Sequence, residues 1–287
     1  MPQTGSTRKL IVKIIRLVAI IMCFLALTIL TQIGGLIYLL SFTTYSFINK
    51  RTGNKILQRF LQFLSFLIIY TIITFTIVPL LAKPLGRVPL PLTTTRHVKP
   101  LNFLTCFLNR HYVRPVLKES TFEVAEQMNS AYPGTVINYL DAGFPFINKF
   151  PLFPHLSHND GKKLDIAFCY NDAQTQQPTN RTPSPIGYGI SEEPRSGEIN
   201  TADVCSDNGY WQYSFLSKIM PQGNKKNFVF DGIRTKKLVN LFIAQPNIGK
   251  IFIEPHLKAR LALTSDKIRF HGCRAVRHDD HIHVQLK

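Results

Sequence analysis

The sequence predicts an α+β domain, a small antiparallel sheet with flanking helices, preceded by two transmembrane helices. Two observations lead to this prediction. Residues 17–48 and 60–82 contain no charged side chain, whereas the rest of the chain is polar, rich in proline and charged. In that polar part, short runs of alternating apolar residues lie between helical patterns, which is typical of strands mixed with helices. The 287 residues are enough for a membrane anchor and one domain.

Residues 1–82 are expected to form a membrane anchor with helices at about 17–42 and 60–82, because about 20 apolar residues cross a bilayer core. The first run follows basic residues, as the h-region of a signal peptide does. It is longer than a typical h-region, however, and no small-residue cleavage pattern follows it. The alternative for the second run, a buried core helix, is disfavoured by its length and its Ile, Leu, Phe and Thr content.

The distribution of basic residues does not favour either orientation of this anchor in the membrane. Basic residues are enriched on the cytoplasmic side of membrane proteins. Four precede the first span and four lie between the spans, namely Arg8, Lys9, Lys13 and Arg16, and Lys50, Arg51, Lys55 and Arg59. Two spans would place both termini on one side of the membrane, and the charges do not decide which side that is.

The polar part divides into a linker at 83–116 and a domain at 117–287. The linker prediction rests on the prolines of residues 83–101, which show no periodicity. In the domain we expect helices at 117–131, 235–244 and 256–263, and strands near 135–144, 162–170, 250–254 and 281–286. Residues 171–209 are polar and are expected to form a long loop or insertion that contributes little to the core.

The cysteines and the net charge narrow the function classes only a little. Cys106, Cys169, Cys205 and Cys273 match no zinc-ribbon spacing, but their even number permits two disulfides in an exported domain. In a cytosolic domain they would be buried thiols. The formal net charge of +17 suits an anionic membrane surface or an acidic substrate. No nucleic-acid-binding motif accompanies it, so we do not expect a nucleic-acid partner.

A dense group of titratable residues, His278-Asp279-Asp280-His281-Ile282-His283, opens the last predicted strand. Alternate residues of a strand point to one face, so His281 and His283 would stand side by side, about 7 Å apart. Such a pair by itself is more often a feature of a polar surface than a metal site.

A second group stands at the strand that begins near residue 162. His158 precedes Gly161 and Asp165 in an H-x-x-G-x-x-x-D spacing, and the glycine allows a sharp backbone path between the two side chains. Zinc accepts imidazole nitrogen and carboxylate oxygen, and a catalytic zinc needs three protein ligands and one open position. His158, Asp165 and one histidine of the last strand would supply such a set.

Together the two motifs resemble those of the zinc peptidases that include lysostaphin-type enzymes, D-Ala-D-Ala metallopeptidases and the hedgehog signalling domain. The segment "HDDHIHV" is most similar to the H-D-x-H-x-H strand of the penicillin-insensitive murein endopeptidases, and "KIFIEPHLKARLAL" resembles the strand-helix unit before it. The resemblance covers roughly residues 118–286. It implies a hedgehog/D-Ala-D-Ala-peptidase-like fold with one Zn²⁺.

The resemblance also implies roles for single residues. His158, Asp165 and His283 are the implied zinc ligands, His281 the implied catalytic partner, and His278 a further active-site histidine. Asp280 stands where the murein endopeptidases have an aromatic residue, whereas the D-Ala-D-Ala metallopeptidases keep a carboxylate there as general base. The base could therefore be His281 or Asp280. An ideal strand favours His281, which shares the face of His283, and a bulge would reverse this.

The predicted function is that of a membrane-anchored zinc metallopeptidase that hydrolyses amide bonds in peptidoglycan peptides. The alternatives are a D,D- or L,D-carboxypeptidase of the same group, a zinc-binding recognition module without hydrolase activity, and a membrane protein that scaffolds partners. A murein substrate requires a bacterial cytoplasmic membrane location with the domain facing the periplasm or cell exterior. With two spans, the basic N-terminus conflicts with that orientation.

Overall fold

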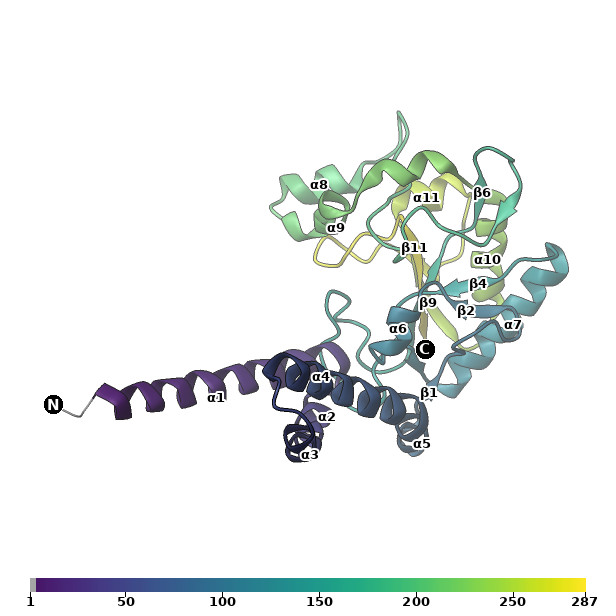
Figure 1. Ribbon diagram of the computed structural model, residues 1–287. Helices are drawn as coiled ribbons and strands as arrows, with labels where there is room; N and C mark the ends of the chain where they lie inside the picture. The colour runs from purple at the N-terminus through teal and green to yellow at the C-terminus, as the bar shows by residue number, and fades with distance from the viewer. Residues whose placement is uncertain (1–3) are drawn as a thin grey trace. The chain divides into compact units, whose positions relative to one another are not determined.

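The computed structural model describes residues 4–287, and the chain divides into two compact units, Met1–Leu81 and Ala82–Lys287 (Figure 1). The described part of the first unit is helical. The second unit combines small sheets with helices, so the predicted α+β class is confirmed at this level.

The first unit contains two helices that are long and apolar enough to cross a membrane, Thr7–Thr31 and Lys55–Leu85. A signal sequence would share the length and composition of the first. The elements in order are α1 (Thr4–Thr31), α2 (Gly34–Ser41), η1 (Phe42–Thr44), α3 (Tyr45–Arg51), α4 (Lys55–Ile72), the π-helical turn η2 (Ile73–Ile77) and α5 (Val78–Ala82).

The first predicted span, 17–42, is wrong at its C-terminal end. Helix α1 ends at Thr31, and Gln32 takes the left-handed conformation with φ 69° before α2 begins. The first backbone N–H groups of a helix have no acceptor within the helix. At the start of α2, the N–H of Gly34 donates instead to Oγ1 of Thr31 at 2.8 Å. Uniform apolar composition concealed this reversal in the sequence.

The second unit is built on a six-stranded sheet in the order β10-β9-β11-β5-β4-β2. Its four inner strands are the four predicted from the sequence, and they pair antiparallel. The two edge strands pair parallel to their neighbours, so the sheet is mixed and not purely antiparallel as predicted. The strands are β2 (Val98–Pro100), β4 (Ile137–Tyr139), β5 (Lys163–Ala167), β9 (Ile248–Phe252), β10 (Ile268–Arg269) and β11 (His281–Leu286).

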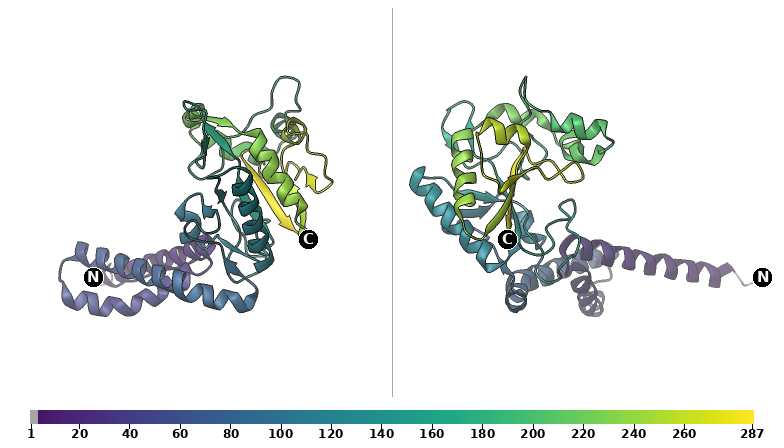
Figure 2. Two further views of the ribbon diagram at one scale, coloured as in Figure 1. Left: turned by 90° about the vertical axis from the view of Figure 1, so that its right-hand side faces the viewer. Right: turned by 180° about the vertical axis from the view of Figure 1, so that it is seen from behind.

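Helices α7 and α10 pack against each other and against strands of this sheet, as Figures 1 and 2 show. Both bury an apolar stripe: Leu117, Val124 and Met128 from α7, and Leu238 and Phe242 from α10. The helices of the second unit are α6 (Phe103–Phe107), α7 (Pro115–Ala131), α8 (Thr201–Asp207), η4 (Trp211–Ser214), α9 (Phe215–Ile219), η5 (Gln222–Asn227), α10 (Gly232–Ala244) and α11 (Pro255–Arg260).

Residues 83–116, expected to be a linker, are folded into the second unit. They carry η3 (Lys83–Leu85), β1 (Val88–Pro89) and β3 (Tyr112–Val113), in addition to β2 and α6. Arg87, Leu90 and Val98 are at most 1% exposed. Of the prolines that suggested a linker, Pro89 and Pro100 lie in the short strands β1 and β2, where a missing N–H donor is tolerated, while Pro84 lies in η3 and Pro91 lies outside these elements.

The polar segment 171–209 also differs from the prediction, because it contributes to the core. It contains α8 and β7 (Pro178–Thr179), which joins β6 (Tyr170–Asp172) and β8 (Phe228–Phe230) in a three-stranded sheet. Tyr188 packs with Leu140 and Ala167 in a buried cluster. This aromatic residue extends from the segment to the candidate site.

Candidate metal centre

Strand register brings the first two site residues together. Strands β11 and β5 pair antiparallel, and His283 lies directly opposite Asp165. Side chains at paired positions stand on the same face of a sheet. Nδ1 of His283 is therefore 2.9 Å from Oδ1 of Asp165, and His281 lies opposite Ala167.

The loop before β5 supplies the third residue. Gly161 has φ 71°, as its position between His158 and Asp165 suggested. A Cβ at Gly161 would stand 1.7 Å from a guanidinium nitrogen of the buried Arg87, so only glycine fits there. The loop then returns His158 to the sheet, where Nδ1 lies 2.6 Å from the carbonyl oxygen of Ala142.

His158, Asp165 and His283 form a buried triangle of ligand-type atoms, each residue at most 2% exposed. Nε2 of His158 is 3.1 Å from Oδ1 of Asp165 and 3.0 Å from Nδ1 of His283. Two ligands of a tetrahedral zinc are about 3.3 Å apart for metal–ligand bonds of about 2.0–2.1 Å. The group could therefore hold a metal ion, and its geometry does not by itself identify which one.

The protonation of the triangle also suits a cation. His158 donates from Nδ1 to Ala142, which leaves a lone pair on Nε2 when the ring is neutral. Burial lowers the pKa of His283 to about 3, so the ring of His283 is neutral. Burial would raise the pKa of Asp165, but the charges of His158 and His281 outweigh it and hold that pKa well below its usual range. Nε2 of His158 and Nδ1 of His283 both face Oδ1 of Asp165, so three atoms of the types that bind metals meet at one point.

His281 stands beside the triangle with Asp280 behind it. Its Nε2 is 3.6 Å from Oδ2 of Asp165, and its Nδ1 contacts Oδ1 of Asp280. The other oxygen of Asp280 accepts a hydrogen bond of 2.5 Å from the N–H of Gly189. Burial would lower the pKa of His281, but the carboxylates of Asp165 and Asp280 together raise it to about 9.

The position of Asp280 bears on the two base candidates. Its carboxylate holds the imidazole of His281 and the backbone of Gly189. It belongs to a His–carboxylate pair, in which the imidazole is the group that carries protons and the carboxylate orients it.

His278 is buried close to both histidines of β11. Its ring centroid lies 4.9 Å from that of His281 and 5.6 Å from that of His283. Burial, with the nearby histidines, lowers its pKa well below the usual value. Its backbone N–H donates to Oε1 of Glu254 at 3.1 Å, which fixes the segment that enters β11.

Three further residues at the site were not found from the sequence. Nδ1 of His155 is 2.9 Å from Oδ2 of Asp141, and the ring of His155 packs against Tyr188. The hydroxyl of Tyr188 accepts from the N–H of Asp141 at 3.0 Å and donates to Oδ2 of Asp165 at 2.9 Å. The three-residue spacing of His155 and His158 was a usable signal. Tyr188, in a polar stretch, carried none.

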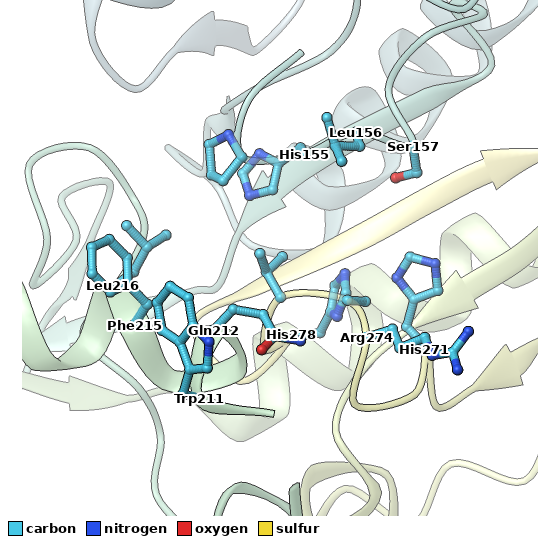
Figure 3. Close-up of a pocket in the computed structure, with 13 residues that line it drawn as sticks. His155, Leu156, Ser157, Trp211, Gln212, Phe215, Leu216, His271, Arg274 and His278 are labelled. Atoms are coloured by element: carbon cyan, nitrogen blue, oxygen red, sulfur yellow. The ribbon is translucent and has the colours of Figure 1, made fainter. Parts of the chain in front are cut away.

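A cavity of about 440 Å³ opens beside these histidines, and three segments line it (Figure 3). His155 contributes from the loop before β5, and His278 from the segment before β11. Trp211 and Phe215 supply aromatic surface, while Arg274 adds a cationic group. Aromatic walls with a few polar groups are typical of sites that bind organic ligands.

In comparisons with known proteins, no family model and no curated protein matches this chain.

Proposed function

We propose that the protein is a zinc-dependent peptidase that hydrolyses amide bonds in peptidoglycan peptides. The observation that carries the proposal is the buried triangle of His158, Asp165 and His283 beside the paired His281 and Asp280. A set of three N/O ligands with a neighbouring proton carrier, next to a cavity, is the arrangement of catalytic rather than structural zinc.

The residues present fit a zinc ion. Two imidazoles and one carboxylate are ligands that zinc accepts, and Ala142 and Tyr188 fix the second contacts of His158 and Asp165. A zinc ion in this position would lower the pKa of a bound water and polarise the scissile carbonyl.

His281 would move the proton in this reaction. Asp280 engages its Nδ1, so Nε2 is the ring nitrogen that faces Asp165. A cation bound by Asp165 would offset the negative charge that raises the pKa of His281 to about 9, and so favour the neutral ring. In that form Nε2 can take a proton from the attacking water and return it to the leaving amine. We assign Asp280 as the residue that orients the imidazole and His278 as a wall of the substrate cavity.

The fold and the family are part of this proposal. The H-x-x-G-x-x-x-D motif runs from the loop before β5 into that strand, and β11 carries the H-x-H motif. Both resemble motifs of the penicillin-insensitive murein endopeptidases. We propose a hedgehog/D-Ala-D-Ala-peptidase-like fold for the second unit on that basis.

A second candidate, a D,D- or L,D-carboxypeptidase, is favoured by one feature of the cavity. Arg274 is among its lining residues, and a guanidinium binds a terminal carboxylate through two parallel hydrogen bonds. Exopeptidase action requires such recognition, whereas endopeptidase action does not.

The test is digestion of purified peptidoglycan by the full-length protein in detergent, loaded with zinc or treated with chelator. We expect cross-linked muropeptide dimers to become monomers only with zinc. Release of terminal D-Ala alone would identify the carboxypeptidase, and no product from zinc-loaded protein would contradict the hydrolase proposal in favour of a binding module.

Metal analysis of variants tests the ligand assignment separately. We expect His158→Ala and His283→Ala to lose stoichiometric zinc and all activity. His97→Asn is the matched control, because His97 lies outside the site at φ 60°, a conformation that Asn tolerates. Stoichiometric zinc in both alanine variants would exclude these ligands.

A further inference from the structure

Helices α1 and α2 pack on each other as a helical hairpin, and the chain continues through η1 and α3 to Arg51. The two glycines that follow the turn allow this close approach. A Cβ at Gly35 would stand 2.5 Å from the carbonyl oxygen of Phe24, and one at Gly34 would stand 3.1 Å from that of Leu27. Small residues at such contacts are typical of helices that pack inside a bilayer.

The returning segment then runs antiparallel to α4. Along the pair, contacts join Tyr38 with Phe66 (ring centroids 6.1 Å apart), Thr44 with Ser65 (Oγ1 to Oγ 2.7 Å), and Asn49 with Gln62 (Oδ1 to Nε2 3.1 Å). At its end, Nε2 of Gln58 donates to the carbonyl oxygen of Thr52 at 2.6 Å. The segment therefore returns to the level at which α4 begins.

The returning segment is uncharged and exposes large apolar side chains, as expected for a helix in contact with lipid. Residues 33–49 carry no charge, and as a helix they would be about 25 Å long, close to the bilayer core of about 30 Å. Leu36 and Phe47 are 65% and 62% exposed.

From this path we infer that the anchor is a helical hairpin plus one crossing helix, with the second unit on the opposite side of the membrane from the N-terminus. The hairpin brings both basic groups, residues 8–16 and 50–59, to one side. The single crossing by α4, η2 and α5 takes Ala82 to the other. The eight basic residues then mark the cytoplasmic side, and the second unit faces outward. The conflict that two spans created is removed.

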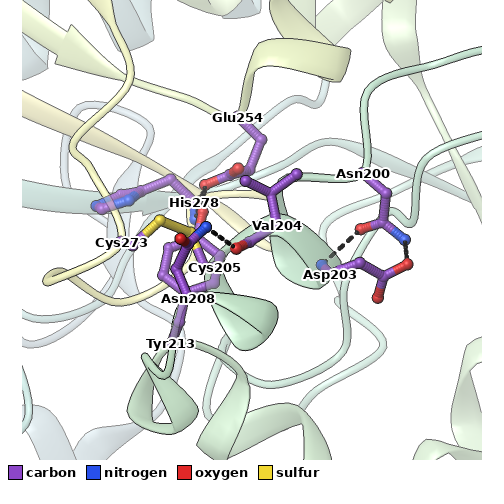
Figure 4. Close-up of a disulfide and its surroundings, with 9 residues drawn as sticks. All are labelled: Asn200, Asp203, Val204, Cys205, Asn208, Tyr213, Glu254, Cys273 and His278. Carbon is purple, nitrogen blue, oxygen red and sulfur yellow. Dashed lines mark hydrogen bonds between the residues drawn. A yellow bond between two sulfur atoms is a disulfide. The ribbon is translucent and has the colours of Figure 1, made fainter.

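A disulfide in the second unit supports this sidedness independently. Cys205 of α8 is bonded to Cys273, which lies in the segment that lines the cavity, while Cys106 and Cys169 are free thiols (Figure 4). Disulfides persist outside the cytosol and are rare inside it. The inference rests on the hairpin and on this disulfide, not on the proposed hydrolase activity.

Protease protection of the full-length chain tests the path. Epitope tags are placed at the N-terminus, at the C-terminus and beside Gly53, whose surroundings are open. In sealed bacterial spheroplasts treated with external protease, we expect loss of the C-terminal tag alone. Loss of the C-terminal and N-terminal tags together would support two spans, and loss of the N-terminal and Gly53 tags would indicate an inverted anchor. Either result overturns the inference.

Trapping thiols in intact cells tests the compartment. After acid quenching, we expect a polymer-linked maleimide to label Cys205 and Cys273 only if a reductant is added. The Cys205→Ser/Cys273→Ser variant is the control, because its labelling should not change with reductant. Labelling of both cysteines without reductant would contradict the outward location. An outward domain with no hydrolase activity would leave this inference intact and remove only the proposed function.

Discussion

The two units of the chain distribute their side chains in opposite ways. In the first unit large apolar side chains such as Ile56 and Leu80 are 81% and 72% exposed, whereas Ser41 and Gln58 are buried. In the second unit the apolar residues of the sheet are buried, and so is a group of histidines and carboxylates at the site. The first arrangement is the one expected of helices in lipid, and the second is the one expected of a domain in water.

The difference shows which interactions determine the packing of each unit. Helices surrounded by lipid gain little from burying apolar surface, and close glycine contacts and hydrogen bonds between helices determine their packing. The second unit has a hydrophobic core that holds β5 and β11 in register. That core supports buried charges at the site, which would be too costly without partners.

The largest difference between the two units is expected when an exposed leucine of each unit is replaced by lysine. Leu25 of α1 is 46% exposed and Leu104 of α6 is 55% exposed. In lipid, Leu25→Lys should cost about 2.5–3.5 kcal/mol of insertion free energy, whereas Leu104→Lys in water should change stability by about 0.5 kcal/mol or less. Carbonate extraction and thermal unfolding measure the two effects. Equal tolerance of both lysines would mean that α1 does not lie in lipid.

The cost of a buried charge in the second unit should appear as a pH dependence. Burial and the nearby Asp279 raise the pKa of Glu254 to about 7. The unfolded chain releases this proton near pH 4.5, so the folded state loses stability as the pH rises from about 4.5 to 7. Glu254→Gln keeps an acceptor for Tyr213 and His278. It should gain on the order of 2–3 kcal/mol relative to wild type between pH 5 and pH 8.

Paired thermal melts of wild type and Glu254→Gln, at equal zinc loading, give that difference directly. The matched control is Glu123→Gln on α7, which is exposed and should shift little with pH. A difference between Glu254→Gln and wild type that stays constant with pH would show that Glu254 keeps an ordinary pKa.

Removing one hydroxyl beside Asp165 should weaken metal binding. The Tyr188 hydroxyl donates to Oδ2 of Asp165, the oxygen that does not face His158. Loss of such a partner typically costs 10–100-fold in metal affinity, so Tyr188→Phe should show a decrease of about that size. Competition with a chromogenic chelator measures it, with Tyr132→Phe as the control. Unchanged affinity would exclude Tyr188 from the support of the site.

The smallest effect is expected from the hydrogen bond between helices of the first unit. Thr44→Val removes the bond from Oγ1 to Ser65, and should cost about 0.6 kcal/mol, the average for such bonds in membranes. Thr43→Val is the control, because the Thr43 hydroxyl donates to the carbonyl oxygen of Leu40 in the same returning segment and not to α4. A double-mutant cycle with Ser65→Ala isolates the pair. A coupling energy near zero would argue against this contact between the helices.

The local composition of the sequence determined much of the second unit and the candidate residues. Local composition predicted the four inner strands: β-branched and aromatic residues indicated the strand near 135–144, and alternation indicated the one near 162–170. The spacing of His158, Gly161 and Asp165 and the strand pattern of His281 and His283 identified the group that the structure brings together. These signals are local, because each depends on residues that are close along the chain.

Only the tertiary structure decided the features that depend on distant partners. Gln32 reverses the chain because Thr31, Gly34 and α1 accommodate the turn, although the surrounding composition is uniformly apolar. Tyr188 reaches Asp165 from a polar segment, and Asp280 turns toward His281 because Gly189 holds its other oxygen. The contacts of Tyr188 with Asp165 and of Gly189 with Asp280 join segments far apart in the sequence, and the turn at Gln32 depends on the packing of α2 against α1. A local pattern cannot encode them, since the free energy that selects them arises only when the partners pack together.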